Sequence, residues 1–255
     1  MELAKLQAVV SGGASGLGLA VVKRIIAEGG QAAILDVNEA QGQETAAALG
    51  ERALFFKTDV SDDGAVIASV DAAAKAFGGI NLAVSCAGIL GAGRVLGRDG
   101  PMAGDYFAKV IMVNLVGTFQ LAKAAAAQMQ HNEPNPEGER GVIVNTASVA
   151  AFEGQIGQAA YSASKAGVAG MALPLAREFA RLGIRVNTIA PGIFLTPMME
   201  GMPEHIQQSL AAQVPFPSRL GRPEEFADMV ACICTSPMLN AETIRLDGAI
   251  RMQPK

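Results

Sequence analysis

The sequence predicts a single α/β domain, residues 1–255, with helices on both faces of a doubly wound parallel sheet of about seven strands. Short apolar runs alternate with helix-like segments along the whole chain. The runs are continuous rather than alternating in polarity, as in strands that are buried on both faces. No stretch has the composition of a linker, a repeat or a low-complexity segment. These observations together predict one sheet covered on both sides.

The composition favours a large core and argues against several functions. Half of the 255 residues are hydrophobic and 17% are charged, which is enough apolar material for a sizeable core. The net charge of -4 argues against a nucleic-acid partner held by a basic face. We see no uninterrupted apolar run of the roughly 18 residues that a membrane span needs, and no secretory signal, so we expect a cytoplasmic protein without a membrane partner. Three cysteines without a CxxC motif and two histidines predict neither a disulfide framework nor a metal site.

A glycine-rich turn joins the first strand to the first helix. The strand is expected over 6–11, the glycines are Gly12, Gly16 and Gly18, and the helix reaches about Glu28. Without Cβ atoms the backbone can turn sharply and let a pyrophosphate approach the positive N-terminus of the helix. Such a turn is a weak signal by itself, but it stands here between a strand and a helix, as nucleotide binding requires.

An acidic residue ends the second strand. This strand is expected over 31–35 and is followed by Asp36, about 20 residues after the turn, where a carboxylate accepts hydrogen bonds from the adenosine ribose. Because its charge would repel a 2′-phosphate, the predicted cofactor is NAD rather than NADP. The alternative is that Asp36 only ends the strand or caps the next helix.

The middle of the chain continues the alternation. The expected elements are helices over 39–49 and 63–77, strands over 53–56 and 81–85, a loop over 89–104, and a long helix over 105–130. The long helix contains Asn114, a residue type that competes for backbone hydrogen bonds in a helix. A positional role and an ordinary buried amide are both open for it.

The segment after the fifth strand, 141–147, carries the candidate chemistry. Tyr161 and Lys165 are four residues apart, so on a helix they share one face. A phenol has a pKa of about 10, and a neighbouring ammonium favours the phenolate, which brings Tyr161 closer to acid/base work near neutral pH. Ser148, on the preceding loop, can donate a hydrogen bond to the same substrate oxygen. These groups suit proton transfer to or from a carbonyl or alcohol, whereas a surface Tyr–Lys pair is the alternative for this short pattern alone.

The last third of the chain supplies the remaining elements. They are a helix to about 180 with Pro174 inside it, a strand over 183–189 followed by Pro191 and Gly192, a helix over 223–236 and a strand over 243–247. Between them, residues 194–217 combine several prolines with flexible methionines, which favours a substrate lid. A plain surface helix and loop is the alternative for that segment.

In order and spacing, these residues resemble the short-chain dehydrogenase/reductase family over almost the whole chain. The matching positions are the turn 12–18, Asp59, Cys86-Ala-Gly88, Asn114, Ser148, Tyr161-x-x-x-Lys165 and Pro191-Gly192. Ser11 and Ser85-Cys86 depart from the commoner residues of the family. The resemblance implies a Rossmann-type fold. Within the family, 145–165, 213–221 and 244–254 resemble the type II 3-hydroxyacyl-CoA dehydrogenases, which implies NAD, a homotetramer and interconversion of (S)-3-hydroxyacyl-CoA and 3-oxoacyl-CoA.

The resemblance also implies a role for each matching residue. Tyr161 exchanges the proton with the substrate oxygen, and Lys165 favours the phenolate and holds the nicotinamide ribose. Ser148 orients the substrate oxygen, and Asn114 holds a water in the proton relay. The implied cofactor contacts are Gly12, Ser15, Gly16, Leu17, Gly18, Asp36, Asp59, Val60, Cys86, Ala87, Gly88, Tyr161, Lys165, Pro191, Gly192, Ile193, Phe194 and Thr196. The expected substrate contacts are Ser148, Gln155, Gln158 and Tyr161.

Three other functions share parts of this pattern. A 3-oxoacyl reductase acting on acyl carrier protein typically prefers NADPH and the opposite hydroxyl stereochemistry, and Asp36 argues against it. A steroid or other secondary-alcohol dehydrogenase would use the same residues. A catalytically silent dinucleotide-binding scaffold is disfavoured by the intact set Asn114, Ser148, Tyr161 and Lys165.

Overall fold

In the computed structural model, which describes residues 1–98 and 100–254, seven parallel strands form the main sheet. The strands are β1 (Gln7–Ser11), β2 (Gln31–Asp36), β3 (Ala53–Lys57), β4 (Leu82–Ser85), β7 (Gly141–Thr146), β8 (Ile184–Pro191) and β9 (Thr243–Leu246). Their order is β3-β2-β1-β4-β7-β8-β9, so the chain winds outward from the middle in both directions. The direction in which successive strands are added to the sheet reverses between β1 and β4. Sheets of this kind bind ligands beyond the carboxyl ends of the strands at that point.

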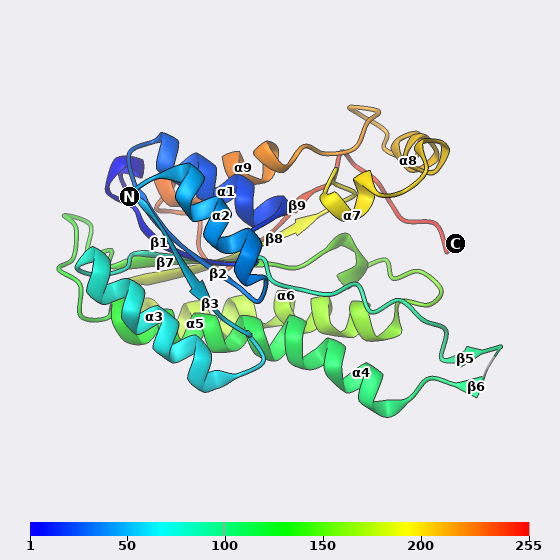
Figure 1. Cartoon of the computed structure of the whole chain (residues 1–255), viewed down its shortest axis with the longest axis horizontal. Helices are drawn as coiled ribbons and strands as arrows, with labels where there is room; N and C mark the ends of the chain where they lie inside the picture. Colours follow the sequence, from blue (N-terminus) through cyan, green and yellow to red (C-terminus); the bar gives the residue numbers. More distant parts are fainter. Residues whose placement is uncertain (99, 255) are drawn as a thin grey trace.

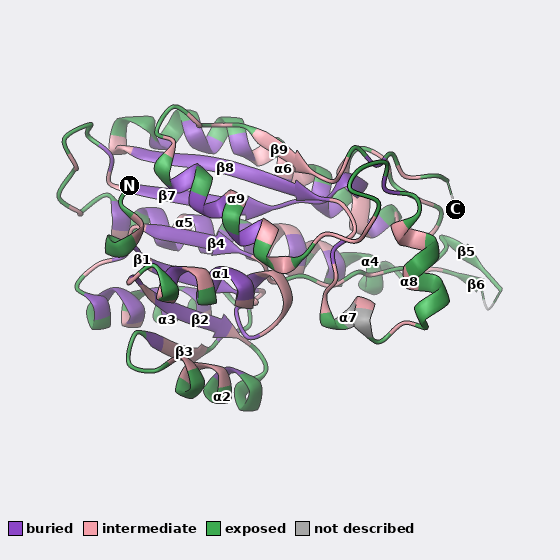
Figure 2. Cartoon of the chain, turned by 90° about the horizontal axis from the view of Figure 1, so that it is seen from above, coloured by how far each residue is buried: buried purple, intermediate pink, exposed green. Residues whose placement is uncertain are grey.

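Helices cover both faces of the sheet (Figure 1). One layer contains α1 (Gly16–Ala27), α2 (Glu39–Leu49) and α9 (Pro223–Thr235), and the other contains α3 (Asp63–Phe77), α5 (Gly117–Met129) and α6 (Ala159–Phe179). Successive strand residues face opposite layers: Val9 and Ile143 belong to one core cluster, Val10 and Val144 to the other. Apart from the edge strands β3 and β9, which are largely half-buried, the strands of the main sheet are buried over nearly their whole length (Figure 2). Burial on both faces is the reason that their sequences are continuously apolar.

The long helix expected over 105–130 is interrupted in the structure. It consists of α4 (Gly104–Ile111), a π-helical turn η2 (Met112–Val116) and α5, and the Gly117 N–H donates to the Met112 carbonyl, five residues earlier. A Cβ atom on Gly117 would lie 2.7 Å from Cγ2 of Val60, so this turn packs closely against the loop after β3. Single π turns inside helices occur frequently at functional sites. This one carries Asn114.

The helix Gly104–Met129 is also long and apolar enough to cross a membrane by length and composition, although the sequence shows no uninterrupted apolar run of that length. Its most apolar 18-residue window has a mean hydropathy of 1.5, and 56% of that window is buried inside the protein. Leu121, Ala125 and Met129 are completely buried in the cluster between α3 and the sheet. The hydropathy of this helix therefore matches its place in the core.

The remaining segments are short. They are three 3₁₀ turns, η1 (Leu3–Lys5), η3 (Val149–Ala151) and η4 (Ala180–Leu182), the helices α7 (Pro197–Glu200) and α8 (Glu204–Ala211), and the strands β5 (Leu96–Gly97) and β6 (Gly100–Pro101). β5 and β6 pair as a small antiparallel hairpin inside the stretch that the sequence predicts as a loop. Helix α6 continues through Pro174. The hairpin, α8 and the C-terminal segment lie at the same end of the molecule (Figures 1 and 2).

Candidate active site

A cleft of about 480 Å³ opens at the carboxyl ends of β1 and β4, where the winding of the sheet reverses. It brings together most of the residues that the sequence predicts as cofactor contacts. The lining residues are Gly12, Ser15, Gly16, Leu17, Gly18, Leu35, Asp36, Val37, Thr58, Asp59, Val60, Cys86, Ala87, Gly88, Ile89, Val113, Thr196 and Pro197. The position and the lining of this cleft match those of a dinucleotide site.

The glycine-rich turn forms the floor of the cleft. Gly12 has a φ of +64°, and a Cβ atom there would lie 2.7 Å from the backbone nitrogen of Ala87. Only glycine allows both this conformation and this close approach of β1 to β4. Ser15 is the N-cap of α1, but its side chain makes no capping hydrogen bond. The first N–H groups of α1 can therefore donate to an anion such as a pyrophosphate.

Asp36 lies at the end of β2 with its carboxylate held by backbone donors. Its Oδ2 accepts a hydrogen bond from the Ala14 N–H (3.2 Å) and its Oδ1 accepts one from the Asn38 N–H (3.0 Å). Helix α2 is capped by Asn38, whose side chain accepts from the Gln41 N–H. Capping of α2 is therefore the role of Asn38, and the carboxylate of Asp36 retains lone pairs for a hydroxyl.

Asp59 and Val60 form the wall beyond β3. The Asp59 carboxylate accepts hydrogen bonds from the hydroxyl (2.7 Å) and the backbone N–H (2.9 Å) of Ser61, which hold its pKa below the usual range. Val60 is almost fully buried. These contacts fix the loop that closes this side of the cleft.

Six residues that line the cleft are not among those predicted from the sequence. They are Leu35, Val37, Thr58, Ile89, Val113 and Pro197. Leu35, Val37 and Thr58 directly adjoin the predicted residues Asp36 and Asp59 at the ends of β2 and β3. The rule that ligands bind beyond the carboxyl ends of parallel strands could have identified those three.

Ser148 is positioned as a hydrogen-bond donor. It is buried at the start of η3, and its hydroxyl oxygen accepts a hydrogen bond from the Ala150 N–H at 3.2 Å. Since a lone pair of the oxygen is used in this way, its proton can point elsewhere. The hydroxyl forms a hydrogen bond with the Tyr161 phenol, and this hydrogen bond acts to lower the pKa of the phenol. The structure thus brings together two of the predicted catalytic groups.

The protein alone does not lower the pKa of Tyr161, contrary to the expectation from the Tyr–Lys spacing. Burial raises the pKa of the phenol, because a phenolate is poorly solvated in this position, and the hydrogen bond from Ser148 offsets only part of the effect. The Nζ atom of Lys165 lies 5.8 Å from the centre of the Tyr161 ring. Helical spacing placed the two side chains together, but it could not predict the cost of burial.

Lys165 is buried and tied to the sheet. Its Nζ donates a hydrogen bond to the Thr146 carbonyl at 2.8 Å, which leaves two N–H donors for other partners. Burial lowers the pKa of the ammonium to about 8. Burial also raises the pKa of the Cys86 thiol to about 11, so that Cys86 stays neutral at physiological pH.

Asn114 is completely buried and holds the backbone beside the cleft. Its Oδ1 accepts from the Ile89 N–H (2.8 Å), and its Nδ2 donates to the Ile89 carbonyl (2.9 Å). Its Nδ2 also donates a hydrogen bond to the hydroxyl of Ser164 on α6 at 3.1 Å. The structure gives Asn114 a positional role between β4 and α6, while the role in a water relay stays a prediction.

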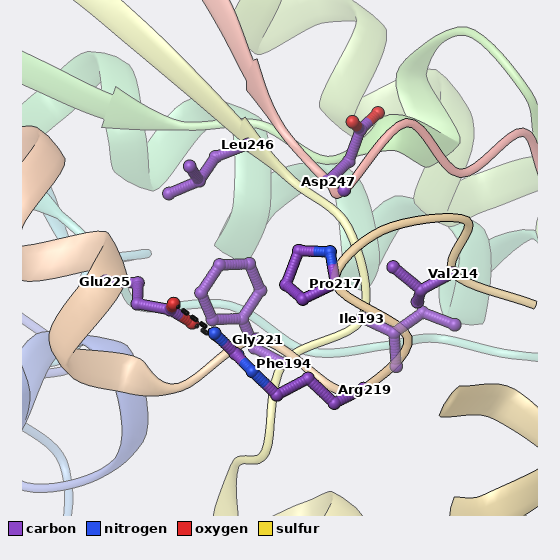
Figure 3. A pocket seen from close by; sticks show the side chains of 10 residues that line it. Ile193, Phe194, Val214, Pro217, Arg219, Gly221, Glu225, Leu246 and Asp247 are labelled. Atoms are coloured by element: carbon purple, nitrogen blue, oxygen red, sulfur yellow. Dashed lines mark hydrogen bonds and ion pairs between the residues drawn. The ribbon is translucent and has the colours of Figure 1, made fainter. Parts of the chain in front are cut away.

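The predicted residues after β8 divide between two places. Thr196 lines the cleft, whereas Ile193 and Phe194 line a separate pocket of about 120 Å³ (Figure 3). Phe194 lies in this pocket, where its backbone forms an isolated parallel bridge with Gly221. The Arg219–Glu225 ion pair forms one wall of the pocket. Pro191 ends β8, and the Gly192 N–H donates to the carbonyl of Leu246 on β9.

The two glutamines predicted as substrate contacts are hydrogen-bonded within the protein. Gln158 Oε1 accepts from the Gln155 N–H at 3.1 Å, and the Gln155 side chain donates to the Gln253 carbonyl at 2.9 Å. Both belong to the loop between Ser148 and Tyr161. The C-terminal segment therefore lies against the loop that joins Ser148 to Tyr161, the two residues predicted to contact the substrate oxygen.

Comparisons with known proteins show similarity over most of the chain. The family model described as short chain dehydrogenase matches residues 7–207. The chain is 51% identical to the 3-hydroxyacyl-CoA dehydrogenase type-2 of Rattus norvegicus over 98% of this chain and 96% of the relative, and also 51% identical to that of Homo sapiens with the same coverage. The crystal structure of 3-hydroxyacyl-CoA dehydrogenase type-2 from Mycobacterium avium superposes with a TM-score of 0.92 at 46% identity, covering 97% of this chain and 96% of that one.

Proposed function

The chain belongs to the short-chain dehydrogenase family, and from that premise we propose that it is an NAD-dependent dehydrogenase that interconverts (S)-3-hydroxyacyl-CoA and 3-oxoacyl-CoA. The observation that carries the substrate assignment is the 51% identity, over nearly the full length of both chains, to relatives named for this substrate. The cleft and the group Ser148, Tyr161 and Lys165 provide the chemistry that such a reaction needs.

The reacting oxygen belongs beside the Ser148 hydroxyl and the Tyr161 phenol. NAD, when bound, supplies the hydride acceptor for the alcohol, or the donor for the ketone in the form of NADH. Tyr161 takes the hydroxyl proton when the alcohol is oxidised and returns it when the ketone is reduced. Ser148 donates a hydrogen bond to the same oxygen and so fixes its position. The charge of the Lys165 ammonium favours the phenolate at the moment when Tyr161 accepts the proton.

The lining of the cleft supports NAD as the cofactor. Asp36 and Asp59 place carboxylates in it, and no lysine or arginine lines the described part of the cleft. A 2′-phosphate would meet the negative charge of Asp36 without a cation to balance it. We expect Asp36→Ala to relax the preference for NAD, measured as the ratio of kcat/KM for NAD to that for NADP. An unchanged ratio would remove Asp36 from this role.

We further propose that the protein is a homotetramer located in the cytoplasm. Tyr106, Phe107, Met112, Phe119 and Leu173 are large apolar residues exposed on the helical face of α4, η2, α5 and α6. Such a concentration of exposed apolar side chains is typical of a surface that a second copy covers. The three free thiols fit a reducing compartment, and cell fractionation tests the location.

NAD-linked turnover on a panel of substrates tests the proposed activity. The panel contains (S)- and (R)-3-hydroxyacyl-CoA of several chain lengths, a hydroxysteroid and simple secondary alcohols. Turnover that favours the (S)-acyl-CoA esters supports the proposal. Activity confined to steroids or simple alcohols assigns the alternative of a general secondary-alcohol dehydrogenase. A preference for the (R)-isomers with NADPH favours the acyl-carrier-protein reductase instead.

A further inference from the structure

The C-terminal segment is attached to the loop between Ser148 and Tyr161 by its main chain. The Ile156 N–H donates to the Pro254 carbonyl at 3.0 Å, and the Gln155 side chain donates to the Gln253 carbonyl. Both acceptors are backbone atoms, so the attachment depends on the path of the segment more than on its side chains. Residues 251–254 thus run alongside the loop that precedes Tyr161.

Glu153 is the centre of this attachment. Its carboxylate receives two hydrogen bonds from the Arg245 guanidinium, at 2.8 and 3.2 Å, and one from the Met252 N–H at 3.1 Å. Arg251 forms an ion pair with the same carboxylate at 3.3 Å. Burial by itself would raise the pKa of Glu153, but these hydrogen bonds and positive charges hold it below the usual range. Glu153 therefore stays ionised and paired at neutral pH.

Arg245 connects this group to the sheet. It lies on β9, next to Leu246, which is paired with Pro191 at the end of β8. Its guanidinium also donates to Asp247 at 2.8 Å and stands 5.6 Å from the centre of the Phe152 ring. A planar guanidinium can make all of these contacts at once, whereas an ammonium cannot.

The loop is also bound to the segment that precedes β5. The Gly93 N–H donates to the Gly157 carbonyl at 2.8 Å. The loop 152–158 is thus held by the segment around Gly93 as well as by the C-terminal segment. Helix α6 starts at the end of this loop, only two residues before Tyr161.

We propose that residues 251–254 form a wall of the substrate site. Glu153 and Arg245 are positioning residues: they clamp this wall to the loop 152–158. Through this clamp they determine how well the acyl substrate is bound. This inference rests on the proposed function for the identity of the substrate. It predicts an effect on substrate affinity rather than on hydride transfer, because neither Glu153 nor Arg245 belongs to the group around Tyr161.

The test compares three variants: Glu153→Gln, Arg245→Lys, and a chain shortened after Arg251. For each, we expect KM for the acyl-CoA substrate to rise about tenfold, the scale of one lost charge-assisted hydrogen bond, while kcat and KM for NAD change by less than about twofold. Hydrogen exchange at residues 152–158 should accelerate in all three variants. The matched control is Glu39→Gln, which breaks the exposed Lys57–Glu39 pair on the far edge of the sheet and should change none of these values.

The outcomes separate the clamp from the proposed function. If the wild-type enzyme oxidises only other alcohols, the acyl-CoA assignment fails and the KM for those alcohols tests the clamp. The clamp is refuted if the shortened chain keeps both the wild-type KM and the wild-type exchange of residues 152–158. It is also refuted if the variants lower kcat and raise KM for NAD to the same extent, since that pattern indicates a general loss of structure. Should Glu153→Gln not fold, the shortened chain decides.

Discussion

At the scale of the residue, burial acts on both members of the Tyr161–Lys165 pair and favours the neutral form of each. It raises the pKa of the phenol and lowers the pKa of the ammonium to about 8. The charges that proton transfer needs are therefore costly in the protein alone. This cost is typical of a catalytic group that is held in place by the fold around it.

Tyr161→Phe should retain binding of NAD and lose turnover by a factor of about 10² to 10⁴, the usual contribution of general acid–base catalysis. The substitution removes the proton-transferring hydroxyl and keeps the ring. Steady-state kinetics and calorimetric titration with NAD measure the two effects. Tyr106, the other tyrosine, donates to the Ala92 carbonyl, and Tyr106→Phe is the control that should stay active. Comparable activity of the Tyr161→Phe and Tyr106→Phe variants would contradict the assignment.

Lys165→Met should inactivate the enzyme and stabilise the fold at neutral pH. Because the folded-state pKa is about 8, below the ordinary value of 10.5, burial of the ammonium costs stability below pH 8, and this cost fades as the pH rises toward 10.5. We expect a gain in unfolding free energy of at most about 3 kcal/mol at pH 7, reduced by the lost hydrogen bond to Thr146.

Denaturant unfolding of the wild type and of Lys165→Met at pH 7 and pH 9 measures this gain. The advantage of the variant should be smaller at pH 9, where part of the wild-type lysine is already neutral. A variant that is less stable than the wild type by the same amount at both values would show that the burial of the charge has no net cost.

At the scale of the element, the π turn in the long helix determines how the chain beside the cleft is held. It carries Asn114, whose amide binds both backbone polar groups of Ile89 and contacts α6. Gly88 lies directly before Ile89, and a Cβ atom there would be 3.1 Å from Asn114 Oδ1. One side chain therefore fixes the segment between the end of β4 and the hairpin arm.

Asn114→Ala should lower the unfolding free energy by about 1 to 3 kcal/mol, because it leaves the partly buried N–H and carbonyl of Ile89 without their hydrogen bonds to Asn114. It should also lower kcat/KM and accelerate hydrogen exchange at Ile89. The matched control is Asn132→Ala, because Asn132 donates to the carbonyls of Ile80 (2.7 Å) and Arg140 (2.9 Å) at the other end of the sheet. Equal losses of activity in the two variants would mean that Asn114 acts only through stability.

At the scale of the whole molecule, the two faces of the sheet differ in what their helices present to solvent. The face of α4, η2, α5 and α6 carries the exposed apolar residues proposed as the surface between subunits. Phe119 lies on α5 in this face and is 42% exposed.

Phe119→Glu should reduce the mass measured by light scattering from that of a tetramer to that of a smaller species, since a charge would be buried between subunits. Ile67→Glu provides the control: Ile67 is 39% exposed on α3, outside the proposed surface, and its variant should remain tetrameric. A wild-type protein that is monomeric, or a Phe119→Glu variant of unchanged mass, would rule out this surface.

The sequence predicted the fold and most of the residues that line the cleft because both follow from local patterns. Continuous apolar runs identify strands buried on two faces. Asp36 ends β2, and Gly12 and Cys86 directly follow β1 and β4. In a parallel sheet those ends meet at one edge, so the order of residues along the chain was enough to bring them together. The position of Tyr161 one helical turn from Lys165 follows in the same way from helical spacing.

Only the tertiary structure decided how those residues behave. The pKa values of Tyr161 and Lys165 depend mainly on burial in the folded chain, which the four-residue spacing of the two side chains cannot predict. Asn114, on the π turn, binds Ile89 and Ser164, which lie 25 and 50 positions away in the sequence, and the Glu153 clamp joins residues about 90 to 100 positions apart. Local sequence determines which conformations a segment favours. The cost of a buried charge and the choice of its partner are set by everything that surrounds it in the folded chain.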